Sequence, residues 1–182
     1  MVGAGLRGQG RCNGKAGEGM FEKYIDMALE RGAAEVQVID PHEVVTAAFV
    51  QHKCRYGCDR YGMSRCCPPH TPTWRETRDI LDCYTKGLLI RDPGWGTTAM
   101  VGEIGHELFF DGYYKVVGFG AGFCQLCKEC SMDACPNRRM ALPSMEACGI
   151  DVFATAHAFG MPCEVVESPA APHNAYGLVC IE

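Results

Sequence analysis

Cysteine constrains this chain more than any other residue, because thirteen of its 182 residues are cysteines and most of them fall in two short clusters. The first cluster lies in CRYGCDRYGMSRCCPPH (residues 54–70), and the second lies in CQLCKECSMDACP (residues 124–136). Secreted proteins pair cysteines as disulfides, but here the number is odd and the N-terminus lacks the apolar segment of an export signal. Clustered cysteines in a reducing compartment more often bind metal. We therefore interpret both clusters as metal sites of a cytoplasmic protein.

The second cluster has the more specific spacing. Cys124, Cys127 and Cys130 form a C-x2-C-x2-C run, and Cys135 and Pro136 follow it. This is the opening of the bacterial ferredoxin pattern C-x2-C-x2-C-x3-C-P, with four residues instead of three in the last gap. A structural zinc site more often has two separate C-x2-C pairs with a longer gap between them. The spacing therefore favours an iron–sulfur cluster, with zinc as the alternative.

The first cluster has a less common spacing. Cys54, Cys58 and Cys67 follow the pattern C-x3-C-x8-C and can supply three ligands to a metal. The radical-SAM pattern C-x3-C-x2-C is not matched, because Tyr61 stands at its third position. The first cluster is therefore interpreted as an incomplete ligand set that needs a fourth residue from elsewhere in the chain.

Helical and extended patterns alternate along the rest of the chain. Apolar spacing predicts helices over 21–32, 74–84, 100–111 and 150–159, with a capping box at Thr73 and Glu76 and a short helical turn after Asp40. Apolar runs predict strands over 35–39, 47–53, 87–91, 113–119, 162–166 and 176–182. We expect an α/β fold in one domain over residues 20–182, with a mixed sheet, helical crossovers and two inserted cysteine-rich loops. The glycine-rich residues 1–19 predict a flexible tail.

The charge balance excludes some classes of partner. The formal net charge is −5 and no run of lysine or arginine is present, which argues against a nucleic-acid partner. No apolar stretch reaches the roughly 20 residues that a membrane helix needs. Neither nucleic acid nor a membrane is therefore expected as a partner.

The chain resembles a domain-of-unknown-function family of small cysteine-rich proteins that are described as predicted metal-binding proteins. The resemblance runs from about residue 20 to the C-terminus. It rests on the cysteine spacings given above and on CPP (67–69), TPT (71–73), GYYK (112–115), GAG (120–122), PSMEACGIDVFATA (143–156) and YGLV (176–179). It implies metal binding and names no reaction.

The resemblance also sorts the cysteines. Eight fall at the family's cysteine positions: Cys54, Cys58, Cys67, Cys124, Cys127, Cys130, Cys135 and Cys148. Eight thiolates are what two [4Fe–4S] clusters with four ligands each require. By analogy with two-cluster ferredoxins, Cys135 would complete the first cluster and Cys148 the second, while the uncrossed pairing remains open. Cys66 is expected to be a spare thiol, and the others fall outside the motif: Cys12, Cys83, Cys163 and Cys180.

Together these features predict an iron–sulfur protein with two [4Fe–4S] clusters that transfers electrons, alone or as a subunit of a redox enzyme. The acidic charge balance favours a redox partner with a basic surface. Two alternatives remain open. One is an enzyme that binds its substrate at an open iron, with Arg60, Arg65 and His70 as candidate positioning groups. The other is a structural or adaptor protein that binds zinc.

Overall fold

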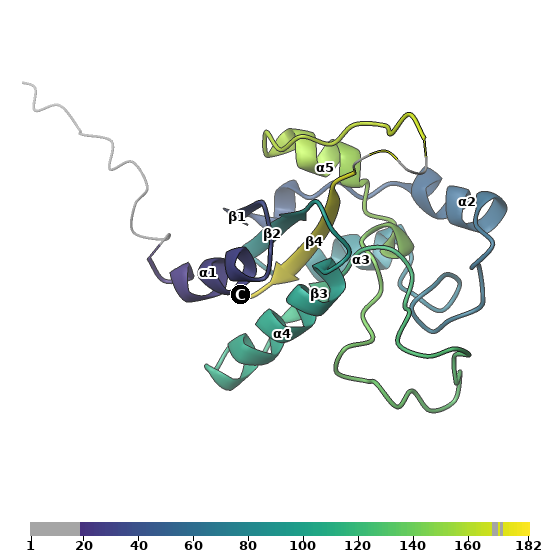
Figure 1. The fold of residues 1–182 in the computed structure, drawn as a ribbon, viewed down its shortest axis with the longest axis horizontal. Coiled ribbons are helices and arrows are strands. Elements are labelled where there is room, and N and C mark those ends of the chain that lie inside the picture. The colour runs from purple at the N-terminus through teal and green to yellow at the C-terminus, as the bar shows by residue number, and fades with distance from the viewer. Residues whose placement is uncertain (1–18, 169–170, 172) are drawn as a thin grey trace, which may run out of the picture.

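A four-stranded sheet forms the centre of the computed structural model, which describes residues 19–168, 171 and 173–182 (Figure 1). The strands are β1 (Glu35–Ile39), β2 (Gly87–Asp92), β3 (Val117–Phe119) and β4 (Ala175–Cys180), in the order β1-β2-β4-β3. The combination of helices and strands confirms the predicted α/β class. All three strand pairings are antiparallel, whereas a mixed sheet was expected. Among the described residues, the one parallel pairing is the isolated bridge between Gly120 and Ser144.

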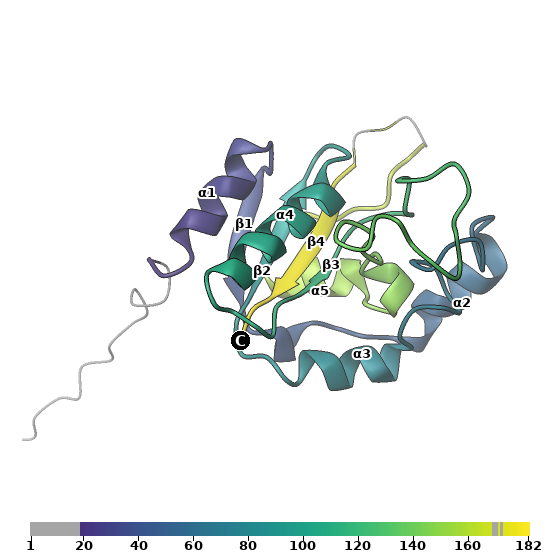
Figure 2. The ribbon, with the colours of Figure 1, turned by 90° about the horizontal axis from the view of Figure 1, so that it is seen from below.

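Helices cover both faces of this sheet (Figure 2). The helices are α1 (Glu22–Glu30), α2 (Ala48–Gly57), α3 (Trp74–Leu81), α4 (Thr97–Phe110) and α5 (Val152–Ala158), with single 3-10 turns η1 (Pro41–Glu43) and η2 (Glu146–Cys148). Leu88 and Ile90 of β2 pack with residues of α1 and α4, and Leu89 packs on the opposite face with residues of α3 and α5. Burial on both faces explains why β2 reads as a continuous apolar run rather than an alternating one.

Helix α4 lies directly on β3 and β4 because glycines face it. A Cβ atom at Gly177 would lie 2.6 Å from Val101 Cγ2, and one at Gly118 would lie 2.6 Å from Val101 Cγ1. Larger residues at these two positions would push the helix away from the sheet. In the described part of the chain, α4 included, no helix combines the length and the apolar character that crossing a membrane requires.

Several predicted elements are confirmed and three are corrected. The predicted strand over 47–53 is wrong, because this segment forms α2. Val50 is the one buried residue of α2, and a half-buried strand would bury alternate residues. The side chain of Gln51 fixes the helix by donating to the carbonyls of Pro72 (2.8 Å) and Ala147 (3.1 Å).

Two other predicted strands differ in the structure. Residues 162–166 form no strand, and β3 is shorter than predicted because a turn occupies 113–116. Residues 1–18 of the predicted tail, with Cys12, lie outside the described residues.

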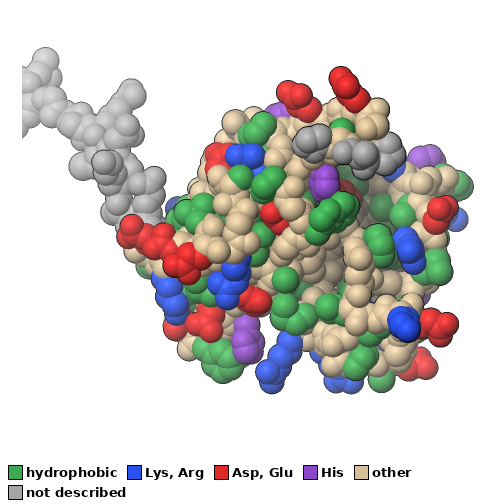
Figure 3. Space-filling view, in the orientation of Figure 1, with side chains coloured by type: hydrophobic (Ala, Val, Ile, Leu, Met, Phe, Trp, Pro, Cys, Tyr) green, Lys and Arg blue, Asp and Glu red, His purple; other side chains and the backbone are tan. Residues whose placement is uncertain are grey.

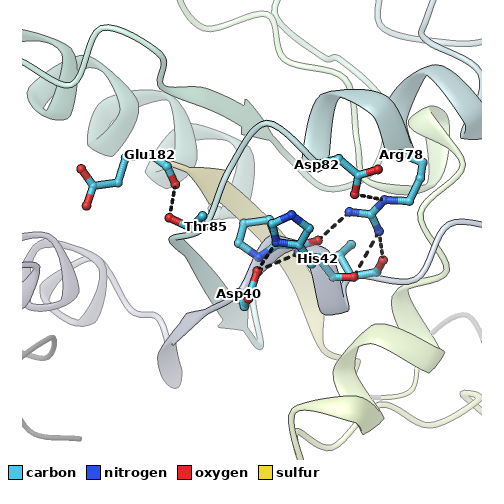
Figure 4. A network of polar contacts seen from close by, with 8 residues as sticks. Asp40, His42, Arg78, Asp82, Thr85 and Glu182 are labelled. Carbon is cyan, nitrogen blue, oxygen red and sulfur yellow. Dashed lines mark hydrogen bonds and ion pairs between the residues drawn. The ribbon is translucent and has the colours of Figure 1, made fainter.

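A polar network joins α3 to the segment around η1 (Figure 4). The guanidinium group of Arg78 donates to the carbonyls of Val44 (2.6 Å) and Pro41 (2.9 Å), and its Nε donates to Asp82 Oδ1 (2.8 Å). The predicted capping box at Thr73 and Glu76 is present at the start of α3. These contacts fix α3 and therefore fix the segment that leads out of the first cysteine cluster.

Candidate metal centre

The two cysteine clusters lie in loops that meet at one end of the molecule, away from α1 (Figures 1 and 2). The first loop (54–70) begins in the last turn of α2, and the second follows β3. The guanidinium group of Arg65 in the first loop donates to the carbonyls of Met132 (3.1 Å) and Asp133 (3.3 Å) in the second. The guanidinium carbon of Arg60 lies 4.6 Å from the ring centroid of Phe123, which adds a cation–π contact between the loops. Both arginines therefore join the two clusters.

Three cysteines of the first loop surround one cavity of about 210 Å³, which we call the first thiol cavity. Cys54 lies in the last turn of α2, and Cys58 is the C-cap residue of that helix. Residues four apart on a helix lie on the same face, so α2 brings these two side chains toward the same region. Cys67 completes the thiol lining, and Glu146 borders the cavity from η2.

Three cysteines of the second loop line a larger and more open cavity of about 770 Å³, the second thiol cavity. They are Cys124, Cys127 and Cys130. Cys67 lines this cavity as well as the first, so the two cavities adjoin at its side chain. The structure thus brings the two predicted groups of three cysteines to neighbouring cavities.

The two predicted fourth ligands lie in different surroundings. Cys135 lines a small cavity of about 30 Å³ together with Cys124, Cys127, Cys130 and Cys66. Cys148 is fully buried on η2, where it belongs to the hydrophobic core cluster. The assignment of Cys135 to the first metal and Cys148 to the second stays a prediction, as does the alternative pairing.

Cys66 lies among the predicted ligands although sequence reasoning set it aside. Burial, followed by the neighbouring thiol of Cys124, raises the pKa of Cys66 to about 12. Burial also raises the pKa of Cys148 to about 12, with smaller contributions from Cys66 and Glu146. Since the thiolate is the form that binds metal, metal binding at these positions must release protons, and affinity must rise with pH.

Hydrogen bonds reach the sulfur atoms from Arg60, a candidate positioning group, and from Asn137, which the sequence patterns did not indicate. The side-chain amide of Asn137 donates to Cys127 Sγ at 3.1 Å, and the backbone N–H of Arg60 donates to Cys58 Sγ at 3.4 Å. Such bonds stabilise thiolates and tune the metal that they bind. Asn137 follows the Cys135–Pro136 pair, so its place just after the ligand pattern is the only sequence signal for this role. His70 is exposed, and its backbone N–H donates to the carbonyl of Cys67 (3.1 Å).

The donor chemistry of the cavities fits a metal that prefers sulfur. Thiolates select zinc and iron–sulfur clusters over hard cations such as magnesium. Among the described residues, no three Cys, His, Asp or Glu side chains are close enough to share a single metal ion. The thiols line the walls of the cavities, and the fold therefore presents sulfur-lined spaces to a metal.

Comparison with known proteins gives one result that bears on this site. No curated protein and no solved structure shows significant similarity to the chain. The model of one family, described as "Predicted metal-binding protein (DUF2284)", matches residues 37–181. That span contains both thiol cavities and all eight predicted ligands. The chain therefore belongs to this family of predicted metal-binding proteins.

Proposed function

We propose that this metal-binding protein holds two [4Fe–4S] clusters and transfers electrons, either alone or as a subunit of a redox enzyme. The observation that carries the proposal is the pair of adjoining thiol cavities, which share Cys67. Cys54, Cys58 and Cys67 would hold one cluster, and Cys124, Cys127 and Cys130 the other. Cys135 and Cys148 would supply the remaining ligands. The clusters would supply one-electron oxidation and reduction, and the chain would bind and shield them.

The number of thiols supports iron–sulfur clusters over a single zinc ion. Structural zinc takes four ligands in a tetrahedron. The small cavity alone is lined by five cysteines, and Cys54 and Cys58 line a further cavity beyond them. Two four-iron clusters use eight thiolates, which is the number of cysteines at family positions.

The surface around the loops suits a transient redox partner. Cys58 and Cys127 are exposed, which places the proposed clusters near the surface. Exposed apolar side chains lie in the same two loops, namely Tyr56, Met63, Phe123 and Leu126. Weak electron-transfer complexes bury small interfaces, and the net charge of −5 favours a basic partner.

The experiment that tests the proposal is the measurement of iron and acid-labile sulfide in protein purified without oxygen. We expect about eight irons per chain and a reversible one-electron EPR signal. Cys127→Ser should lower the iron content, because Cys127 lines the second thiol cavity. Cys83→Ser is the matched control, because Cys83 is exposed and lies just after α3, outside the cysteine loops. Its iron content should equal that of the unaltered chain.

A colourless protein with stoichiometric zinc and two or fewer irons per chain would contradict the proposal and favour the structural zinc function.

The variants Cys135→Ser and Cys148→Ser distinguish the two possible pairings of the fourth ligands with the clusters. Each substitution should alter the EPR signal of one cluster, and the cluster affected identifies the one to which that cysteine binds.

A further inference from the structure

A further cavity lies beside the cysteine loops, and among its described lining residues Cys124 is the one predicted metal ligand. Its volume is about 510 Å³, and we call it the aromatic cavity. It lies between the first turn of α4, the loop after β3 and the start of β4. Apolar and aromatic side chains dominate its wall, including Trp95, Phe123, Leu126, Val152 and Tyr176. Volume and lining match those of sites that bind small organic molecules.

This cavity borders the proposed metal site directly. Cys124 lines both the aromatic cavity and the second thiol cavity, and so do its neighbours Phe123, Gln125 and Leu126. A molecule in the aromatic cavity would therefore lie next to the second group of cysteines. This adjacency holds whichever metal the cysteines bind, so the inference goes beyond the proposed function and does not rest on it.

One polar atom of His173, a residue that lines the cavity, has no partner among the described residues. Nε2 of His173 is buried and makes no hydrogen bond to any described residue. Its ring packs against the indole of Trp95, with ring centroids 4.6 Å apart, which fixes its position at the cavity. A buried polar atom without a partner is costly, and most such atoms in proteins are satisfied by a protein group, water or a ligand. The cavity therefore offers a hydrogen-bonding position to an occupant.

The charges around the cavity disfavour an anion. No lysine or arginine lies among the described residues of its wall, and Glu146 adds a carboxyl group. The N-terminal end of α4 would attract an anion, but Asp92 already occupies it. The carboxylate of Asp92 accepts from the backbone N–H groups of Gly94 (2.7 Å) and Gly96 (2.9 Å) and from the hydroxyl of Thr97 (3.0 Å).

Figure 3 shows the hollowed face of the molecule in the orientation of Figure 1, with hydrophobic and histidine side chains beside the hollow. We propose that the aromatic cavity binds an uncharged small organic molecule with an apolar, ring-sized body and a hydroxyl-like group that bonds to His173 Nε2. A hydroxyl fits this position because it both donates and accepts, and so matches either tautomer of the histidine.

The test is isothermal titration of the metal-loaded full-length chain with four probes of similar size. Benzyl alcohol is uncharged and carries a hydroxyl, benzoate is an anion, benzylamine is a cation at pH 7, and toluene has no polar group. We expect benzyl alcohol to bind with a Kd of about 1 mM or tighter, which is modest for a ligand of this size. Benzoate should bind at least about tenfold more weakly, because no cationic group in the described wall pairs with it. Benzylamine should also bind at least about tenfold more weakly, because the exposed carboxyl group of Glu146 offsets only a small part of the cost of desolvating an ammonium group.

Two variants connect the binding to this cavity. Ala99→Leu adds apolar volume to the cavity wall and should weaken the binding of benzyl alcohol at least about tenfold. Ala158→Leu is the matched control, because Ala99 and Ala158 are both exposed helix positions and only Ala99 lines the cavity. His173→Phe should weaken the binding of benzyl alcohol about three- to tenfold and leave the binding of toluene unchanged, because only the alcohol loses a hydrogen bond. Thermal unfolding of each variant verifies that the fold is retained.

The proposal is overturned by any of three results. One is the absence of heat for both uncharged probes at 10 mM. Another is binding of benzoate or benzylamine as tight as that of benzyl alcohol. The third is equal binding to the Ala99→Leu and Ala158→Leu variants. The iron content does not enter these measurements, so their failure is distinguishable from failure of the iron–sulfur assignment.

Discussion

Cys180 and Cys127 carry the same thiol group in opposite surroundings. Cys180 is fully buried in β4, within the core cluster between the sheet and the helices α3 and α5. Cys127 is exposed in the second loop and accepts a hydrogen bond from Asn137. Sequence spacing separated these two roles, because Cys180 lies in an apolar run and Cys127 in a repeated C-x2-C pattern. For a single cysteine, the surroundings therefore decide whether its thiol group packs in the core or is available for chemical reaction.

Alkylation should report this difference. Burial raises the pKa of Cys180 to about 12, so at pH 8 only about one molecule in ten thousand carries the thiolate that reacts. We expect iodoacetamide to label exposed Cys83 readily and Cys180 only after unfolding, as read by mass spectrometry of peptides. The raised pKa of Cys180 also makes the stability of the fold depend on pH. An unfolded chain ionises Cys180 near pH 9 and the folded chain does not, so stability falls as pH rises above about 9. Equal labelling rates in the folded protein would contradict the assignment.

Any residue with a side chain would be strained at the position of Gly149. Its φ angle is +78°, and an added Cβ atom would lie 2.6 Å from Trp74 Cβ. Gly160 has a similar φ angle of +71° but open space around it. We expect Gly160→Ala to cost about 1 kcal/mol of unfolding free energy through backbone strain alone, and Gly149→Ala to cost about 3 kcal/mol or more. Denaturant unfolding measures both, and similar losses would show that the contact with Trp74 is readily relieved.

At the scale of elements, strong local signals were predicted correctly and weak ones were not. Strand β1 alternates polar and apolar residues in EVQVI, β2 contains the apolar run Leu88–Leu89–Ile90, and α3 begins with a complete capping box. Helix α2 has only one buried residue, so its apolar pattern is too sparse to reveal a helix. The spacing of Cys54 and Cys58 was the overlooked signal, because four residues are about one helical turn.

The contacts between elements were beyond sequence reasoning for a different reason. Arg65 joins the two cysteine loops through carbonyl groups of Met132 and Asp133, and Arg78 joins α3 to carbonyl groups near η1. Every residue has a backbone carbonyl group, so no sequence pattern marks which ones accept. The grouping of the cysteines was predictable in part, since each group of three is local. The shared position of Cys67 depends on tertiary packing.

Arg78 provides a test at this scale. Its fork of donors reaches Val44 and Pro41 at once, which a lysine ammonium group cannot reproduce. We expect Arg78→Lys to lower the free energy of unfolding by about 2 kcal/mol, because part-buried carbonyl groups lose their donors. Asp82→Asn removes only the exposed ion pair with Arg78 and should cost less than about 0.5 kcal/mol. Equal losses in the two variants would show that the ion pair, and not the carbonyl contacts, stabilises α3.

Considered as a whole molecule, the protein has a sheet and helices that pack without the two cysteine loops. The two core clusters contain no described residue from 54–65 or from 123–141. The predicted cysteine ligands come from both loops and from η2, and Cys148 alone among them belongs to a core cluster. A bound metal therefore orders the loops more than it orders the sheet.

Hydrogen exchange after metal removal should show this division. We expect anaerobic treatment with a chelator to increase amide exchange in 54–70 and 123–141, where few apolar contacts remain. Amides of β2 and β4 should keep slow exchange, because antiparallel pairing and burial on both faces protect them. Metal-loaded protein treated in the same way without the chelator is the control. Loss of protection throughout the sheet would show that the metal is needed for the whole fold.

Strand β4 has a consequence for the synthesis of the protein. It is the last strand along the chain, yet it lies between β2 and β3, so the sheet cannot close until residues 175–180 have left the ribosome. Roughly one hundred residues follow the first cysteine loop before this strand, which takes between about 5 and 20 seconds to translate. During that interval the thiols of both loops emerge on a chain that has no core to shelter them. Protection from oxidation in the nascent state therefore falls to the reducing agents and metal donors around the ribosome, and not to the fold.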